Sequence, residues 1–391
     1  MSLKTIGELK DSVSGILSGT NLDKVTNLYT AFERAARKLV QNADIPEATI
    51  KESIVFYDGV YDYEISENIF GGGLVDIQPQ GITRTFLDDV QKMPVAQFDQ
   101  SKWNLPSGYK VTFEWRDGTP IMRVSSSRPL PGVFLDSMKE ITGWVGAGSA
   151  STPTLDRSVY YEAPASLKFT LTGSSTGSLT KAITQTDLTD YEDVGVIFLA
   201  LEIPPGATAT DLTSVEVRLG SSASDYDSVT ATEGFLGAWV AGEWLLVAFD
   251  MATSTSTGTP DWTELDYVQV NFAHTATLTN MRVGGLWIAQ PAPHNVIFQT
   301  SAIFLNPTTG VRIKNIVDDN TEIVLNDASF LLYEHESALA IALQGKQDKQ
   351  IQQLRTTLNT GEGDDSSLYE KYRGDNPSSE LRTVGSYYEE L

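Results

Sequence analysis

Short apolar runs, broken every few residues by Ser, Thr, Gly or Asp, fill the middle of the chain from Thr142 to Gln290. Runs this short, at regular spacing and separated by turn residues, are typical of a β-sandwich. The pattern predicts strands near 194–201, 215–219, 244–249, 268–272 and 286–288. The central stretch is therefore expected to form one all-β domain.

The two ends of the chain follow a helical period instead. Apolar residues recur on one face between Val25 and Val40, behind a capping sequence at 20–23, so residues 1 to about 43 are predicted to be helical. This helix packs either on its own domain or on a neighbouring subunit, and the sequence leaves both open. Residues 326–329 can cap a long helix over 328–358, whose polar second half either lies in solvent or meets another surface.

Two β-hairpins are predicted between the first helix and the central domain. Asp58-Gly59 separates β-prone runs at 54–57 and 60–65, and Asp117-Gly118 separates an alternating run at 109–115 from another at 120–125. Asp-Gly between two β-prone runs is a strong signal for a two-residue hairpin turn. Further short strands are expected at 74–79 and between 296 and 325.

Neither flank has enough strands for an independent sheet, so the two are predicted to form one discontinuous domain that carries the sandwich as an insertion. Proline-containing segments at 125–132 and 291–293 mark the two junctions. The expected fold is multidomain α+β with an all-β insertion. Its parts are an N-terminal helix and first half-domain (1–135), the inserted sandwich (136–292), the second half-domain with the long helix (293–358), and a linker with a C-terminal docking tail (359–391).

The docking tail is rich in aromatic and apolar residues after an acidic, glycine-containing linker at 359–367. Aromatic residues this dense at a terminus favour docking on a partner or a neighbouring subunit. The residues expected to make these contacts are Leu368, Tyr369, Tyr372, Tyr387, Tyr388 and Leu391.

Composition narrows the class of protein. The hydrophobic fraction of 41% in 391 residues is that of a folded chain, and no apolar run reaches the roughly 18 residues of a membrane helix. The first residues lack the apolar core of a signal peptide. The net charge of -23 disfavours binding of nucleic acid phosphates, although DNA could pass nearby. Residues 136–292 hold 19 acidic and 6 basic residues, so the insertion carries more than its share of that charge.

No stretch carries a catalytic signature, and the chain is expected not to be an enzyme. The absence of cysteine excludes disulfides, cysteine-based zinc sites and a cysteine nucleophile, and the three histidines are scattered. Gly71-Gly72-Gly73 lacks the Lys-Ser/Thr of a phosphate loop. We therefore expect no cofactor and no metal. A structural calcium held by Asp156, Glu162 and Asp250 is the alternative.

The segment Tyr160–Leu171, with its small-residue turn followed by Ser166-Leu167-Lys168-Phe169-Thr170-Leu171, resembles the first strand of carbohydrate-binding-module-like jelly rolls. Residues 261–270 resemble the penultimate strand of such modules. The resemblance implies a jelly-roll β-sandwich over 136–292, and it raises glycan binding as a function. Exposed aromatic rings bind sugars, and the candidate glycan contacts are Trp239, Tyr226 and Trp244.

The flanks resemble a different group of proteins, the neck and head–tail connector components of tailed bacteriophages. The positions that match are Asp58, Gly59, Val60, Tyr61, Tyr63, Ile65, Asp76, Ile77 and Gly81, and residues 369–380 resemble C-terminal segments of the same group. The resemblance implies a non-enzymatic virion protein, assembled in the host cytoplasm, that forms a homo-oligomeric ring between portal and tail proteins, with twelve-fold symmetry expected to match the portal. The alternative hypothesis is a glycan-binding surface or tail-fibre protein.

Overall fold

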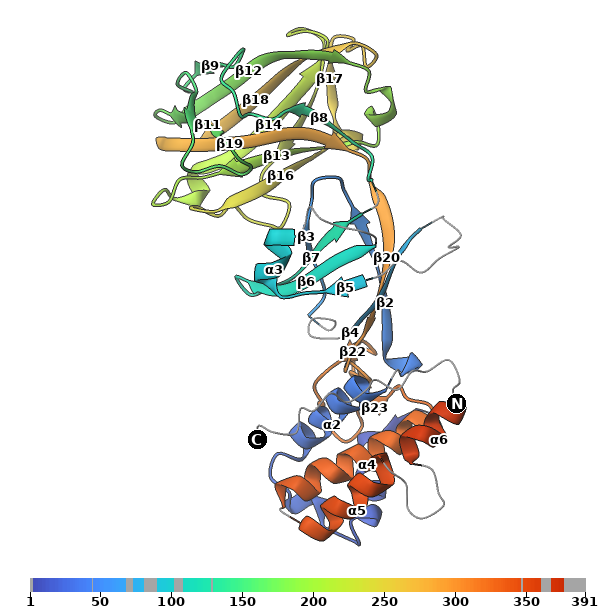
Figure 1. Ribbon diagram of the computed structural model, residues 1–391. Coiled ribbons are helices and arrows are strands. Elements are labelled where there is room, and N and C mark those ends of the chain that lie inside the picture. The colour runs from blue at the N-terminus through green and yellow to red at the C-terminus, as the bar shows by residue number, and fades with distance from the viewer. Residues whose placement is uncertain are drawn as a thin grey trace. The chain divides into compact units, whose positions relative to one another are not determined.

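The computed structural model describes residues 3–43, 45–67, 73–80, 90–101, 108–127, 129–345, 347–359 and 367–375. The chain divides into two compact units, each built from separate segments. Unit 1 comprises Met1–Ile54, Glu64–Ser125 and Asn295–Leu391, and unit 2 comprises Val55–Tyr63 and Ser126–His294 (Figure 1). The predicted fold class is confirmed, because unit 1 mixes helices with small sheets and unit 2 is a β-sandwich.

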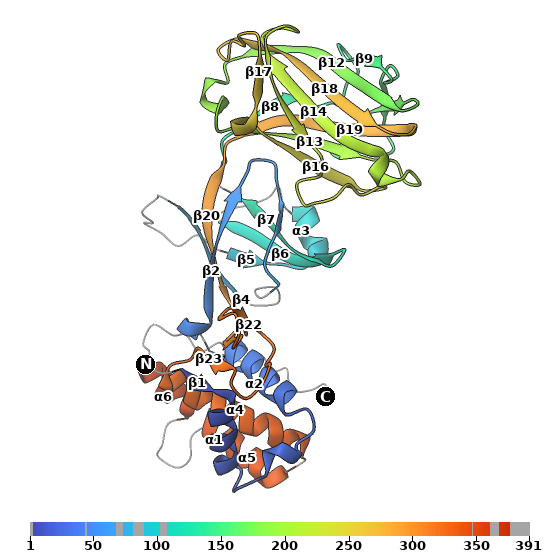
Figure 2. The same ribbon diagram turned by 180° about the vertical axis from the view of Figure 1, so that it is seen from behind.

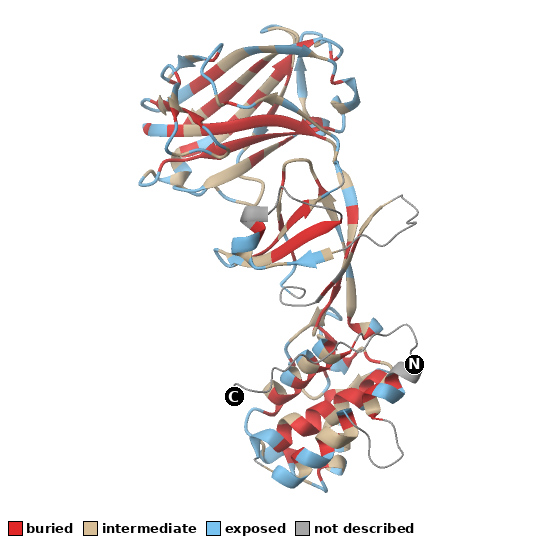
Figure 3. Cartoon of the chain, viewed as in Figure 1, coloured by how far each residue is buried: buried red, intermediate tan, exposed pale blue. Residues whose placement is uncertain are grey.

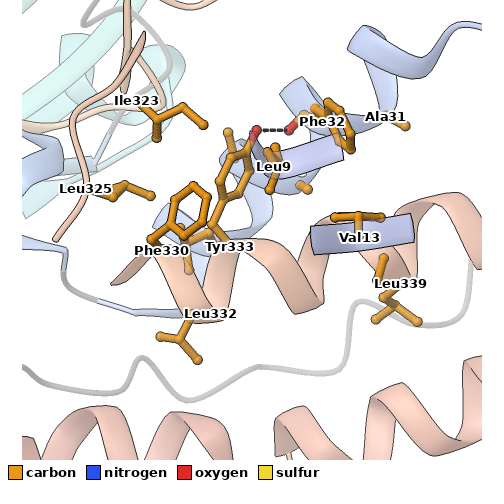
Figure 4. Close-up of a cluster of buried hydrophobic side chains, with 14 of the residues drawn as sticks. Leu9, Val13, Ala31, Phe32, Ile323, Leu325, Phe330, Leu332, Tyr333 and Leu339 are labelled. Atoms are coloured by element: carbon orange, nitrogen blue, oxygen red, sulfur yellow. Dashed lines mark hydrogen bonds between the residues drawn. The ribbon is translucent and has the colours of Figure 1, made fainter. Parts of the chain in front are cut away.

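A helical core dominates unit 1. Thr5 begins the first helix with a capping box, in which its hydroxyl accepts from the Glu8 N–H and the Glu8 carboxylate accepts from the Thr5 N–H. In Figure 4 the fully buried Tyr333 lies among apolar side chains and donates its O–H to the carbonyl oxygen of Phe32 over 3.0 Å. The α-helices that contribute to this core are α1 (Ile6–Ile16), α2 (Leu28–Asn42), α4 (Asp327–Gln344), α5 (Asp348–Asn359) and α6 (Leu368–Asp375).

Both long helices predicted from the sequence are divided. The N-terminal one consists of α1, a 3-10 turn η1 (Leu22–Lys24) and α2, because Ser18 and Gly19 adopt positive φ after α1. The C-terminal one ends at Gly345, a poor helix former, and resumes as α5. Asn326 caps α4 as predicted, accepting from the Ser329 N–H over 2.8 Å. The buried residues of α5 belong to the same core as α4, so α5 stays within unit 1.

The start of the C-terminal tail also belongs to this core. Tyr369 and Tyr372 in α6 are buried and Leu368 packs beside them. The Tyr369 hydroxyl donates to Glu336 Oε1 over 2.7 Å, and Lys38 Nζ lies 3.2 Å from Glu336 Oε2. This corrects the prediction that the two tyrosines dock on a partner, since they complete their own core, whereas Leu368 is partly exposed and its docking stays a prediction. The other predicted docking residues, Tyr387, Tyr388 and Leu391, lie outside the described part of the chain.

Three small sheets accompany the helices. The first has the order β1 (Lys4–Thr5), β23 (Glu322–Ile323), β21 (Phe304–Leu305), β22 (Arg312–Ile313). The second has the order β2 (Thr49–Phe56), β20 (Ala292–Gln299), β4 (Gly73–Pro79). The third has the order β3 (Asp62–Glu64), β7 (Thr119–Ser126), β6 (Tyr109–Arg116), β5 (Val90–Lys92). The short elements η2 (Pro46–Ala48) and α3 (Val95–Ser101) complete this part.

One predicted hairpin forms and the other does not. Strands β6 and β7 are neighbours, and Asp117 (φ 51°) and Gly118 (φ 86°) both adopt the positive φ that a type I′ turn requires. Asp58-Gly59 also makes a turn, but the strands on its two sides, β2 and β3, belong to different sheets. The second hairpin prediction is confirmed, and the first is wrong because its strands find other partners.

Unit 2 is a sandwich of two sheets around one apolar core (Figures 2 and 3). One, here called the β14 sheet, has the order β17 (Thr255–Thr257), β15 (Tyr226–Ala231), β14 (Leu212–Gly220), β18 (Leu265–His274), β12 (Ser175–Thr186), β9 (Val145–Gly148). The other, the β19 sheet, has the order β10 (Thr154–Asp156), β11 (Ser166–Leu171), β19 (Leu278–Ala289), β13 (Val196–Glu202), β16 (Trp244–Asp250), and β8 (Gly132–Asp136) pairs with β19. Short 3-10 turns η3 (Thr189–Tyr191), η4 (Ala209–Asp211) and η5 (Met251–Thr253) lie between strands.

The early segment Val55–Tyr63 belongs to the sandwich unit through aromatic contacts on the outer face of the β19 sheet. The ring of Tyr57 meets Phe198 edge-on at 5.2 Å, and Trp287 stacks on Phe198 at 5.6 Å. Trp287 Nε1 donates to the carbonyl oxygen of Asp58 over 2.8 Å. Gly59 (φ 72°) lies so close that a Cβ there would be 3.0 Å from Trp287 Nε1. The predicted insertion of 136–292 did not include this segment.

Candidate functional site

The outer face of the β14 sheet carries an ordered array of polar and aromatic side chains. In β14, Val215, Val217 and Leu219 are buried in the core, so the alternating residues Glu216 and Arg218 point outwards. Strand pairing extends each outward position into a row across the sheet. The three rows are Ser178–Asn271–Glu216–Thr230, Thr180–Gln269–Arg218–Ser228 and Ala182–Tyr267–Gly220–Tyr226.

The centre of this face is a fixed network of charged and amide groups. Arg218 donates from Nε to Glu216 Oε1 (3.2 Å) and from Nη2 to Glu216 Oε2 (3.1 Å). Asn271 Nδ2 donates to the same Oε2 over 2.7 Å. Burial lowers the pKa of Arg218, but the bonds to Glu216 outweigh it and the net effect is a raised pKa. The carboxylate is thus neutralised in place, and both side chains are oriented by a two-pronged contact.

Two tyrosines border the network on one side. The Arg218 guanidinium lies 4.8 Å from the centre of the Tyr226 ring, a cation–π distance. Tyr267 donates its O–H to Gln269 Oε1 over 2.8 Å, and burial raises the pKa of Tyr267. Gly220 pairs with both tyrosines, one on each neighbouring strand. The two rings are therefore separated by a residue without a side chain.

The array presents unused hydrogen-bonding groups beside aromatic surface. Within the described residues, no hydrogen bond occupies Gln269 Nε2, Asn271 Oδ1 or Arg218 Nη1. None of these atoms is buried without a partner, so water reaches them. Donors, an acceptor and rings in fixed positions suit a ligand with many hydroxyl groups and apolar C–H faces.

The three residues predicted to contact glycan do not come together. Tyr226 belongs to the array on the β14 sheet, whereas Trp244 lies on the outer face of the β19 sheet. Trp239 lies in the loop between β15 and β16 and packs on the core, with its Nε1 buried and unbonded within the described structure. Trp239 is partly exposed, as Tyr226 and Trp244 are, and its contact with glycan stays a prediction.

Sequence reasoning missed most members of the array, namely Glu216, Arg218, Tyr267, Gln269 and Asn271. Their signal was present as strict alternation of apolar and polar residues in 215–219 and 268–272. The alternation places each residue on an outer face, but it does not say which strands are neighbours.

The acidic residues considered for calcium are also separated. Asp156 accepts from Ser158 and Arg282, Glu162 lies 3.2 Å from Lys139 Nζ, and Asp250 accepts from the Ala252 N–H. Hydrogen bonds from Ser158, and then from Arg282, hold the pKa of Asp156 well below its usual range. Across the described residues no group of three or more His, Asp or Glu side chains could hold a metal ion.

None of the described helices combines the length and the apolar character needed to cross a membrane.

Comparison with known proteins finds similarity in structure alone. No family model matches the sequence, and no curated protein matches it. Among solved structures, a family 11 carbohydrate-binding module from Clostridium thermocellum, in complex with a β-1,3-1,4-mixed-linked tetrasaccharide, is 10% identical with a TM-score of 0.31, over 42% of this chain and 98% of that one. A family 30 carbohydrate-binding module is 10% identical with a TM-score of 0.33, over 41% of this chain and 99% of that one. The CBM22-1 xylan-binding domain from Paenibacillus barcinonensis is 16% identical with a TM-score of 0.28, over 42% and 97%. With scores and identities this low, no residue role is transferred from them.

Proposed function

We propose that the β-sandwich is a non-catalytic glycan-binding module, and that the array on the outer face of the β14 sheet is its binding surface. The observation that carries the proposal is the convergence of Tyr226, Tyr267, Arg218 and Gln269 on one face with oriented, partly unused polar groups. Glycan binding was the alternative in the sequence analysis, and it becomes the main proposal because this constellation supports it.

The dimensions of the array suit an oligosaccharide. The row Thr180–Gln269–Arg218–Ser228 continues to Thr255 in β17, so it crosses five strands. With neighbouring strands about 4.8 Å apart, the row is roughly 19 Å long. That length exceeds a single sugar ring and matches a short chain of several units.

The charge of the surface suits a neutral ligand. The only cation in the three rows, Arg218, is already paired with Glu216, and the other members are uncharged. The surrounding residues 136–292 carry a large excess of acidic groups. A polyanion would be repelled, whereas a neutral polysaccharide would meet only hydrogen-bonding and stacking groups.

The test is binding of the full chain to immobilised neutral polysaccharides, among them mixed-linked β-glucan and xylan, with polygalacturonate as an acidic comparison. Tyr226→Ala is expected to weaken binding roughly tenfold or more, about 1.4 kcal/mol. Val194→Ala, an exposed residue in a loop outside the array, is the control and should leave binding unchanged. Thermal denaturation checks that both variants fold. Absence of binding to every neutral polysaccharide would refute the proposal.

A second proposal concerns where the module works. The resemblance of the flanks to phage connectors supports a virion protein, and two of the matched residues hold defined positions in the fold. Gly59 needs its positive φ, and Tyr63 is buried and donates its O–H to the carbonyl oxygen of Val60. Native mass spectrometry of the purified chain measures its oligomeric state and so tests whether it forms the ring expected between portal and tail. A closed ring would support a connector, and a trimer would point to a fibre.

A further inference from the structure

Trp244 belongs to a second array, on the outer face of the β19 sheet. Strand pairing places it in one row with a charged residue on each of three neighbouring strands. Glu202 in β13 is opposite both Trp244 and Arg282, and Arg282 in β19 is opposite Lys168 in β11. The array therefore combines an aromatic ring with fixed charges, as the array on the β14 sheet does.

An aromatic pair forms one end of this array. The rings of Tyr161 and Trp244 are 5.8 Å apart and tilted by 56°, and both residues are partly exposed. Both rest on Gly284, where a Cβ would come within 2.8 Å of Tyr161 Cβ and 3.1 Å of Trp244 Cη2. The missing side chain at Gly284 lets the two aromatic residues lie close against the sheet.

The charges beside the pair are balanced and held in position. Arg282 Nε lies 2.9 Å from Asp156 Oδ2, and Arg282 Nη1 lies 2.8 Å from Glu202 Oε2. Lys168 Nζ lies 3.7 Å from Asp156. Two acids and two cations leave no net charge, and no hydrogen bond occupies Arg282 Nη2 within the described residues. The chemistry offered is again a neutral, hydrogen-bonding surface beside aromatic rings.

Two other aromatic rings of this outer face, Phe198 and Trp287, are covered by side chains of the same unit. Phe198 is covered by Tyr57 and by Phe235, whose ring lies 5.6 Å away, and Trp287 stacks with Phe134 at 5.8 Å. Phe198 and Trp287 are consequently buried. The part of the face around Trp244 and Tyr161 keeps its rings partly exposed, so a ligand on this sheet would bind there.

We propose that Trp244, Tyr161 and the groups beside Arg282 form a second binding site for a neutral oligosaccharide. This inference rests on the proposed function of the sandwich and extends it, since it makes the module bivalent. Sites on the two outer faces of one sandwich cannot bind the same short oligosaccharide at once. They can engage two segments of a polysaccharide, or two chains, which raises avidity without any change at either site.

The experiment is isothermal titration of the full chain with cellohexaose and with xylohexaose, two soluble neutral oligosaccharides. The unmodified chain is expected to bind two molecules. Each of the single variants, Trp244→Ala and Tyr226→Ala, is expected to bind one. The double variant should bind none. Because Trp244→Ala removes a large side chain, Tyr161→Leu is the second variant for this site, and thermal denaturation checks that each variant folds.

The outcomes separate this inference from the proposed function. One molecule bound, lost in Tyr226→Ala but unaffected by Trp244→Ala and Tyr161→Leu, would overturn the second site and leave the proposed function intact. One molecule bound, lost in Trp244→Ala but retained in Tyr226→Ala, would support this site and overturn the array on the β14 sheet. No binding of either oligosaccharide by the unmodified chain would overturn the second site, and the proposed function falls with it only if every neutral polysaccharide also fails to bind.

Discussion

Replacing Arg282 with methionine removes the cation between two buried carboxylates while keeping an unbranched side chain of similar length. Asp156 and Glu202 are 6% and 4% exposed. Without Arg282, Asp156 keeps its hydrogen bonds from Ser158 and Val159 and its contact with Lys168. The Glu202 carboxylate keeps no ion pair or hydrogen bond from the described residues. The variant therefore has one buried carboxylate without a partner.

The expected loss of stability follows from that burial. Removing one partner of a buried ion pair costs about 3–5 kcal/mol, because the remaining charge stays desolvated. For a unit of this size, each kcal/mol lowers the melting temperature by about 2–4 °C, so the sandwich of the variant should melt roughly 6–20 °C lower. Arg218→Met is the matched control. The side chains of Arg218 and Glu216 are 29% and 24% exposed, and losing such a pair should cost less than about 1 kcal/mol.

The loss should also depend on pH. The depressed pKa of Asp156 contributes stability that is present above its unfolded pKa of about 3.9 and is lost as pH falls below it. The hydrogen bond from Arg282 is one of the causes of that depressed pKa, so in Arg282→Met the pKa of Asp156 should rise and its contribution to stability should shrink. This part of the loss is fully present at neutral pH and disappears as pH falls below the unfolded pKa.

Urea denaturation at pH 7.5 and at about pH 3, followed by tryptophan fluorescence, measures both effects. The signal reports mainly on the sandwich, because unit 2 contains Trp144, Trp239, Trp244, Trp262 and Trp287. Adding Glu202→Gln to Arg282→Met should recover part of the loss at neutral pH. A cost no larger than that of Arg218→Met, or an equal cost at both pH values, would refute the reasoning.

Two further changes test other parts of the fold. Gly59→Ala forces a positive φ on alanine beside Trp287 and should cost about 1–3 kcal/mol in thermal denaturation of the sandwich. Gly173→Ala has a similar φ with open space around it, so an equal loss in both would show that the Trp287 contact is unimportant. Tyr369→Phe removes the O–H donor to the buried Glu336 and should cost about 1.5–3 kcal/mol in urea denaturation followed by far-UV circular dichroism. Unchanged stability would mean that α6 is anchored by its apolar contacts alone.

The elements that the sequence predicts correctly are those decided by local chemistry. The β6–β7 hairpin follows from two alternating runs around Asp117-Gly118, whose residues tolerate the φ that the turn demands. The start of α4 follows from Asn326, whose side chain satisfies a free N–H at the helix end. In both cases the residues that decide the structure lie within a few positions of one another.

The Asp58-Gly59 prediction fails although its local signal is the same. The turn forms, but β2 pairs with β20, which is more than 200 residues away in the sequence. Gly59 is needed for its close approach to Trp287 as much as for the turn. Local propensity here is compatible with two pairings, and packing that the sequence does not display selects one of them.

For the candidate sites too, the sequence does not show which side chains come together. Alternation identifies Glu216, Arg218, Gln269 and Asn271 as outward residues of two strands. Only the register in which β14 pairs with β18 brings them together on one surface. A shift of this pairing by one residue would move the outward side chains of one strand to the core face. The sequence alone does not distinguish Tyr226 from Trp239, because it does not show that Tyr226 lies in a strand of the array while Trp239 packs against the core.

The cations of the sandwich explain why an acidic domain can offer neutral surfaces. Of the six basic residues between 136 and 292, five form ion pairs within it, namely Lys139, Lys168, Lys181, Arg218 and Arg282. Arg218 and Arg282 lie on opposite outer faces, and each neutralises the carboxylates beside the aromatic residues there. The excess of negative charge therefore falls on the remaining surface. Because that charge repels anionic polymers while the two arrays present paired charges, amides and rings, both arrays suit the neutral polysaccharide that we propose as their ligand.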